Sequence, residues 1–176
     1  MDIAGRAHAG ENLAKVLVLR EPEGGPPIVM SDALSVNTIN EDEANIRSPC
    51  LAHGRRKFTE LEEVFPAECQ GVIEALDTVF EHEATTRAQG LRAAARLAYH
   101  QEHSGPIRAA LKVSLEEQIR ERLVEPNGSL GKGFQSLLNH WERLTQFLRV
   151  PGAPLDNNTV ERALKLMIRQ PRNSLF

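Results

Sequence analysis

The sequence is poor in cysteine, in aromatic residues and in net charge. Two cysteines, Cys50 and Cys69, occur among 176 residues and no secretory leader is recognisable, so we expect a reduced, cytoplasmic protein without a disulfide framework. Aromatic residues make up 5% of the chain, too few to predict platforms for stacking nucleic-acid bases. A formal net charge of −3 excludes a uniformly basic coat, so any contact with DNA has to come from local clusters.

Long hydrophobic runs, internal repeats and low-complexity tracts are also missing. No apolar stretch approaches the roughly 20 residues that a membrane-spanning helix needs, so we expect no membrane partner. What is present is typical of a globular protein, since 41% of the 176 residues are hydrophobic. This length predicts one core of ordinary size, with room for an inserted subdomain.

Two short strands are predicted in the first third of the chain. Residues 28–30, Ile-Val-Met, are β-prone and lie between two prolines and a Ser-Asp pair. That pattern indicates a buried strand with Asp32 at its C-terminal end. Residues 48–53 form the second candidate strand.

From residue 55 onward, apolar residues recur every three or four positions, which predicts helices. Pro66 is expected to open one helix, whereas Ser-Gly-Pro at 104–106 and Glu-Pro-Asn-Gly at 125–128 are expected to end others. A further helix is predicted over 130–150, with Trp141 on its apolar stripe as a core residue. Other residues expected on apolar faces include Phe58, Leu61, Val64, Phe65, Leu111, Leu115 and Leu123.

An isolated acid, Glu161, stands at the start of an otherwise basic predicted helix. Together with Asp32 it suggests two of the carboxylates with which a two-metal nuclease holds magnesium. A second interpretation stays open for each. Glu161 follows Asn158 at capping-box spacing, and Asp32 suits the turn after a strand.

Two basic clusters are candidates for contact with DNA phosphates. Arg55, Arg56 and Lys57 directly follow the second candidate strand, close to acids at 60, 62 and 63 that offset their field. Arg162, Lys165 and Arg169 belong to a C-terminal segment that is also basic. For both clusters the alternative is a solvated surface.

A zinc site is a third kind of candidate. Cys50 and His53 have the spacing of half of such a site. A four-ligand set needs a second pair, and Cys69 with His82 does not supply one convincingly. We therefore expect no structural zinc.

Five blocks in order resemble the catalytic domain of DDE transposases of the insertion-sequence-66 family, which moves bacterial mobile elements. Any one block would be a weak match, but the five together span most of the chain. They are HAGENL at 8–13, PPIVMSDAL at 26–34, CLAHGRRKF at 50–58, EPN with LGK at 125–132, and WERLT, DNN and ERALK at 141–165.

The resemblance implies an α/β, predominantly helical fold: an incomplete ribonuclease-H-like core with a large all-α insertion. The implied parts are core strands in 1–57, a helical insertion in 58–150, and the C-terminal catalytic helix in 151–176. Asp32 matches the second acid of the family and Glu161 the third, which together would bind Mg²⁺ or Mn²⁺. DNA is the implied partner, both mobile-element ends and target.

The first acid of the family has no match in this sequence, because Asp2 is the only aspartate before Asp32 and no strand is predicted around it. We therefore expect part of a transposase that is inactive alone. Two alternatives stay open. One is a non-catalytic helical module that binds DNA, itself or a full-length transposase, and the other is a split transposase whose missing strands come from another chain.

Overall fold

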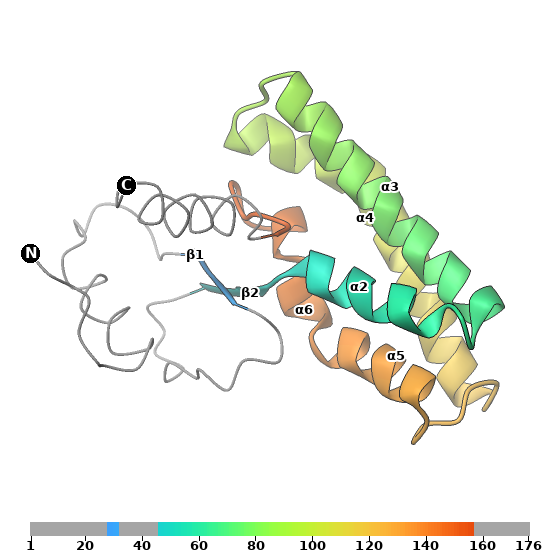
Figure 1. Ribbon diagram of the computed structural model, residues 1–176. Coiled ribbons are helices and arrows are strands. Elements are labelled where there is room, and N and C mark those ends of the chain that lie inside the picture. Colours follow the sequence, from blue (N-terminus) through green and yellow to red (C-terminus); the bar gives the residue numbers. More distant parts are fainter. Residues whose placement is uncertain (1–27, 32–45, 157–176) are drawn as a thin grey trace, which may run out of the picture.

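The computed structural model describes residues 28–31 and 46–156, and this part of the chain is predominantly helical, as expected. A body of helices lies beside a sheet of two short strands (Figure 1). The elements are β1 (Ile28–Ser31), β2 (Ile46–Pro49), α2 (Leu51–Leu61), α3 (Pro66–Ala88), α4 (Ala93–Arg120), α5 (Ser129–Asn139), α6 (Trp141–Leu144) and the 3₁₀ helix η1 (Gln146–Leu148).

The strands β1 and β2 pair in parallel, with Ile28 opposite Ile46 and Ser31 opposite Pro49. The prediction of a strand at 28–30 is confirmed. The prediction of a strand over 48–53 is wrong beyond Pro49, because α2 already begins at Leu51. The change follows from Pro49, which has no amide hydrogen to continue the ladder.

The helices α3 and α4 form a long antiparallel hairpin, and α2 packs across it (Figure 1). Gly90 makes the turn possible, because its φ of +63° suits the left-handed residue that ends a helix. The amide of Leu91 then bonds the carbonyl of Thr86 at 3.0 Å. The predicted opening of a helix at Pro66 is confirmed.

The prediction that 104–106 ends a helix is wrong, because α4 runs through Pro106 without interruption. A proline inside a helix removes one backbone hydrogen bond and usually costs about 3 kcal/mol. Here Ser104, just before it, is buried and its hydroxyl contacts both His82 and His100. Tertiary contacts of this kind outweigh the local preference for a break.

The single helix predicted over 130–150 is divided into α5, α6 and η1. The chain leaves helical geometry at His140 and again at Thr145, where φ is −103° and −111°. The two bends let Trp141, Leu144 and Phe147 all reach the core. The prediction that Trp141 is a core residue is confirmed.

One continuous core joins the helices. Phe58 of α2 stacks on Phe134 of α5 with ring centroids 5.9 Å apart. The predicted core positions Leu111 and Leu115 are buried. Two other predictions are wrong, because Val64 lies in the turn before α3 and Leu123 lies beyond α4, and both are exposed.

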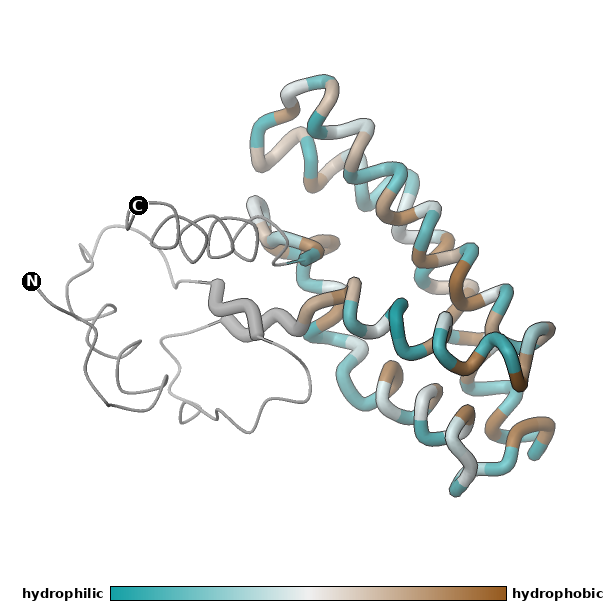
Figure 2. The backbone as a smooth tube through the Cα atoms, viewed as in Figure 1, coloured by the Kyte–Doolittle hydropathy of each residue, from teal (hydrophilic) through white to brown (hydrophobic). Residues whose placement is uncertain are grey.

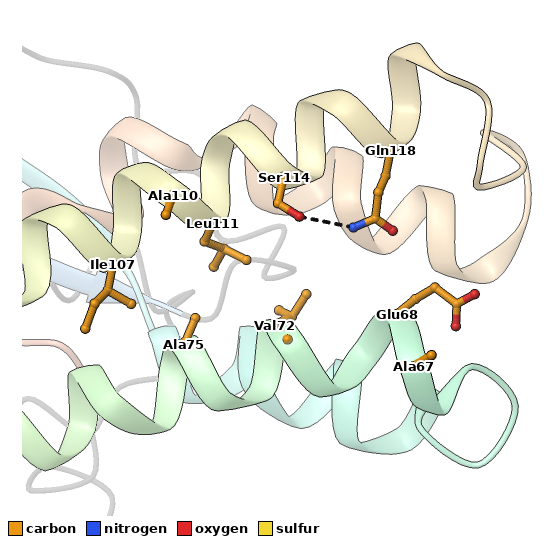
Figure 3. Close-up of a pocket in the computed structure, with 10 residues that line it drawn as sticks. Ala67, Glu68, Val72, Ala75, Ile107, Ala110, Leu111, Ser114 and Gln118 are labelled. Carbon is orange, nitrogen blue, oxygen red and sulfur yellow. Dashed lines mark hydrogen bonds between the residues drawn. The ribbon is translucent and has the colours of Figure 1, made fainter.

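An apolar groove of about 580 Å³ lies between α3 and α4 on one side of the hairpin (Figure 3). Small residues of α3, Ala67, Gly71 and Ala75, leave this space open. Only Glu68 is charged among the lining residues. The groove therefore offers little for metal or phosphate chemistry.

Candidate functional site

The predicted acids and the second basic cluster lie outside the described residues. These are Asp32, Glu161, Arg162, Lys165 and Arg169. The structure does describe the backbone that leads to both acids.

The segments that precede the two acids meet at one end of the helical body. Ser31, the last residue of β1, pairs with Pro49 of β2. Two residues later, the amide of Leu51 donates a hydrogen bond to the carbonyl of Leu155 at 3.0 Å. Leu51 and Leu155 are both buried in the common core. A strand end and the start of the C-terminal segment are thus adjacent.

This adjacency limits how far apart the acids can lie. Asp32 directly follows Ser31 in the sequence, and Glu161 comes six residues after Leu155. Six residues span at most about 20 Å when fully extended. A site shared by the two acids is compatible with this reach and stays a prediction.

The first basic cluster lies on α2, where its three members differ in their partners. Arg55 pairs with Asp77 of α3 through two hydrogen bonds, one of them 2.8 Å from Nη2 to Oδ2. The bond to Asp77 raises the pKa of Arg55 further above its ordinary value, although burial opposes the rise. Arg56 is exposed and lies 3.5 Å from Glu60. Arg55 thus joins two helices, whereas Arg56 remains at the surface.

Lys57 lines a recess of about 250 Å³ between α2 and the start of α5. The other lining residues are Glu60, Leu61, Ser129 and Lys132. Two lysines at one surface recess suit a phosphate group, and Glu60 reduces their combined field. The predicted contact of Lys57 with DNA phosphates would therefore fall at this recess.

A buried ionic network centred on Glu83 links α3 to α4. Glu83 is 5% exposed, and its carboxylate accepts hydrogen bonds from Arg96 (2.7 Å), Arg87 (2.8 Å) and His100 (2.9 Å). His100 is completely buried. Thr86 adds a contact to the backbone carbonyl of Glu83 at 2.8 Å. An anion with three donors is well compensated for its loss of water.

The network continues from His100 to Ser104 and His82, with distances of 2.9 and 3.0 Å from Ser104 Oγ to the two Nδ1 atoms. A neutral His100 donates from Nε2 to Glu83, so its Nδ1 accepts from the Ser104 hydroxyl. The Ser104 oxygen then accepts from Nδ1 of His82. With this assignment, each hydrogen bond from Glu83 through His100 and Ser104 to His82 has one donor and one acceptor.

The pKa values of two groups in this network, Glu83 and His82, differ from their ordinary values. Burial alone would raise the pKa of Glu83, but the hydrogen bonds from His100, Arg96 and Arg87 outweigh it and lower the pKa to about 2. Burial lowers the pKa of His82, and the nearby His103 and His100 lower it further. Glu83 is therefore an anion at neutral pH.

A serine, a histidine and a carboxylate in sequence are also the parts of a hydrolase triad. Here Ser104 and His100 are 0% exposed, so no substrate reaches the hydroxyl. These side chains therefore have a structural role, because their hydrogen bonds join α3 to α4.

Acid should weaken this network in a defined pH range. A carboxylate whose pKa is lower in the folded state stabilises the fold above its unfolded value and loses that effect as pH falls through the folded value. From 4.5 to about 2, the shift of Glu83 corresponds to about 3 kcal/mol, present above about pH 4.5 and lost progressively toward pH 2. Urea unfolding at several pH values would measure this loss. Glu83→Gln should show a flatter profile, and equal slopes for the two proteins would contradict the assignment.

A second buried cation, Arg108, lies in the middle of α4. Its guanidinium carbon lies 4.1 Å from the centre of the Trp141 ring, and the side chain is 1% exposed. No hydrogen bond to its nitrogens is present within the described part of the chain. Burial lowers its pKa to about 10. The contact with the Trp141 face is the compensation that the structure shows.

The network was missed in the sequence, although some of its spacing was visible there. Glu83 and Arg87, like His100 and Ser104, are four residues apart, as helical neighbours are. Glu83 also continues the apolar stripe of Leu76 and Val79 toward the core. The signal in the sequence was therefore the acid Glu83 at a position where the apolar stripe of the helix predicts a buried residue.

No cluster of three or more His, Cys, Asp or Glu residues suited to a metal occurs within residues 28–31 and 46–156. No helix in the described part of the chain is long and apolar enough to cross a membrane. Hydrophobic and hydrophilic residues are interspersed along the long helices α3 and α4 (Figure 2).

Comparison with known proteins identifies the class of this chain as that of the transposases, because a family model described as "Transposase IS66 family" matches residues 9–176. The match covers nearly the whole sequence. The chain belongs to the IS66 transposase family.

One curated relative is the "Uncharacterized protein y4jD" of Sinorhizobium fredii (strain NBRC 101917 / NGR234), which is 30% identical over 128 residues. The match covers 72% of this chain and 24% of the relative, so the chain spans about a quarter of that protein's length. No solved structure matches the chain.

Proposed function

We propose that this chain takes part in the cleavage and joining of DNA at the ends of a bacterial mobile element. Asp32 and Glu161 are two of the carboxylates that hold Mg²⁺ or Mn²⁺ in this proposal. The observation that carries it is the meeting of the backbone before both acids, where Ser31 pairs with Pro49 and Leu51 bonds Leu155. Membership of a transposase family supports the choice of DNA as substrate.

The proposed core is ribonuclease-H-like, with β1 and β2 as two of its parallel strands and residues 58–150 as a helical insertion. The hydrogen bond between Leu51 and Leu155 supports an insertion, because the first and last residues of the helical body lie next to each other. The expected boundary at 57 falls inside α2, so the insertion would share this helix with the core. The proposed substrate is DNA, and the proposed location is the bacterial cytoplasm.

The two acids would act as hard oxygen ligands on neighbouring elements. A bound pair of divalent ions supplies activation of the attacking oxygen and stabilisation of the leaving oxygen at the scissile phosphate. Asp32 and Glu161 would fix where the phosphate is presented. Lys57 and Lys132 at the recess would hold the DNA backbone beside it, with Arg56, Arg162, Lys165 and Arg169 as further phosphate contacts.

No residue of this sequence is assigned as the first acid. We therefore expect these 176 residues by themselves to bind metal without cutting DNA. A non-catalytic helical module remains the second candidate, because the described helices share one continuous core of their own. Metal binding by Asp32 and Glu161 is expected of a transposase component and not of a non-catalytic helical module.

Titration of the chain with Mn²⁺, followed by electron paramagnetic resonance, tests the proposal. Asp32→Asn and Glu161→Gln should each weaken Mn²⁺ binding by at least about tenfold, because each removes a charged ligand. Glu116→Gln is the matched control, since this acid lies on α4 and its side chain is half exposed. Affinity that is unchanged in Asp32→Asn and Glu161→Gln would exclude the metal site and favour the non-catalytic module.

A further inference from the structure

The hydrogen-bond network of the α3–α4 hairpin ends at a histidine that is only partly buried. His82 of α3 bonds Ser104 of α4 through Nδ1, which lies 3.0 Å from the hydroxyl oxygen. No hydrogen bond among the residues that the structure describes uses the other ring nitrogen, Nε2. This second nitrogen of His82 is therefore available to a ligand.

The network also determines which nitrogen of His82 carries the hydrogen. Glu83 is an anion and accepts from Nε2 of His100, so Nδ1 of a neutral His100 accepts from the Ser104 hydroxyl. Ser104 has one hydroxyl hydrogen, and its oxygen therefore accepts from Nδ1 of His82. A neutral His82 with its hydrogen on Nδ1 keeps the lone pair of Nε2. Burial lowers the pKa of His82, which favours this neutral form near pH 7.

A second imidazole lies beside this one. His103 of α4 is exposed, and its ring centre is 5.8 Å from that of His82. Tyr99, one turn earlier on α4, packs against the His103 ring with centres 4.3 Å apart, which restricts the movement of that ring. A metal ion about 2.0–2.1 Å from one nitrogen of each ring, at a tetrahedral angle, holds the ring centres roughly 5–6 Å apart. The two rings therefore have a suitable separation to share one ion.

We propose that His82 and His103 bind a divalent transition-metal ion of the zinc class between α3 and α4. This site uses none of the carboxylates of the proposed function. Imidazole nitrogen suits zinc, nickel and copper, whereas carboxylate oxygen suits magnesium and manganese. Two protein ligands leave the remaining coordination positions to water, so the site is open rather than a closed structural centre.

The surroundings of His82 favour a bound cation. Glu81, next to it on α3, contributes negative charge at the ring. The bonded series of Ser104, His100 and Glu83 orients His82 from behind, as the hydrogen-bond partners of metal-bound histidines do. Because the two ligands come from different helices, an ion bound here joins α3 to α4 and stabilises the folded chain.

Zinc binding by the chain without a polyhistidine tag tests the proposal. Excess Mg²⁺ is present to occupy oxygen ligands. Isothermal titration calorimetry should show zinc binding that His103→Gln weakens by at least about tenfold, because a direct ligand is lost. His103 is exposed, so this variant is expected to fold. His140→Gln is the matched control, since His140 lies between α5 and α6, and it should leave the affinity unchanged.

Ser104→Ala tests the orientation of the ligand separately. It removes the hydroxyl that fixes the hydrogen on Nδ1 of His82, so zinc affinity should fall about tenfold although both imidazoles remain. A second readout needs no metal. Proton–nitrogen correlation spectra of the imidazoles should show the Nδ1–H form of His82 in the wild-type chain and a mixture of both forms in Ser104→Ala. Circular dichroism melts establish that the variants fold.

Several results would overturn the site. These are absence of zinc binding by the wild-type chain, equal zinc affinity in the wild-type chain and His103→Gln, and a wild-type His82 with its hydrogen on Nε2. Zinc should also raise the melting temperature of the wild-type chain more than that of His103→Gln, and equal rises would contradict the bridge between α3 and α4. None of these outcomes depends on the Mn²⁺ titration that tests the proposed function, so either proposal can fail without the other.

Discussion

Replacing Glu83 by alanine should lower the free energy of unfolding by about 3–5 kcal/mol, because it leaves the Arg96 guanidinium without its anion and the His100 ring N–H without its acceptor. Arg96 is 11% exposed on its side chain and His100 is completely buried, so water cannot replace the carboxylate. Urea denaturation at neutral pH, followed by far-ultraviolet circular dichroism, measures the loss.

Glu81→Ala is the control for this change. Glu81 lies two residues before Glu83 on α3 and is exposed, so its removal should alter stability by less than about 0.5 kcal/mol. Similar losses for Glu81→Ala and Glu83→Ala would show that the buried network adds nothing to the stability of the hairpin.

Gly131→Ala should destabilise the protein by about 3 kcal/mol, at the upper end for an overpacked site. A Cβ atom at this position would lie 2.2 Å from the carbonyl oxygen of Glu125 and 2.9 Å from the backbone of Pro126. Both neighbours are backbone atoms, so the first turn of α5 would have to move away from the preceding loop. The shift in urea midpoint is the measurement.

Gly71→Ala makes the same chemical change where there is room. No atom lies within 4 Å of its added Cβ, and the residue is inside α3. Alanine there should raise stability by about 0.5–1 kcal/mol, since it restricts the unfolded chain and favours the helix. Destabilisation by both substitutions would mean that the close approach at Gly131 is not the cause.

Local patterns were sufficient to predict much of the fold. The strand at 28–30, the start of a helix at Pro66 and the burial of Trp141 all follow from short-range periodicity or from the backbone of proline. These signals survive because residues three or four apart face the same way in any helix. The predominance of helix could therefore be predicted without knowledge of the tertiary structure.

Contacts between distant residues account for what the sequence did not show. Ser104 lies 22 residues from His82, and their bond helps to keep α4 intact through Pro106. Arg55 finds Asp77 at the same separation, on another helix. No pattern within one helix indicates such partners. The helix break predicted at 104–106 is therefore absent, and Arg55 of the predicted basic cluster is paired with Asp77.

The candidate site depended on a resemblance rather than on local physics. Capping and metal binding make the same demand on an acid at a helix start, so spacing alone could not separate them for Glu161. Asp32 and Glu161 remain predictions. The structure adds the backbone approach to each acid, which becomes visible only when Leu51 meets Leu155.

That single bond also sets an order of events as the polypeptide folds. Leu51 and Leu155 are about a hundred residues apart, and closing so large a ring costs more entropy than forming a hairpin of neighbours. The α3–α4 pair, joined by a short turn, can form early, whereas the ring closes only after its intervening helices have shortened the path. The approach to the acids is therefore completed late, once the helical body is in place.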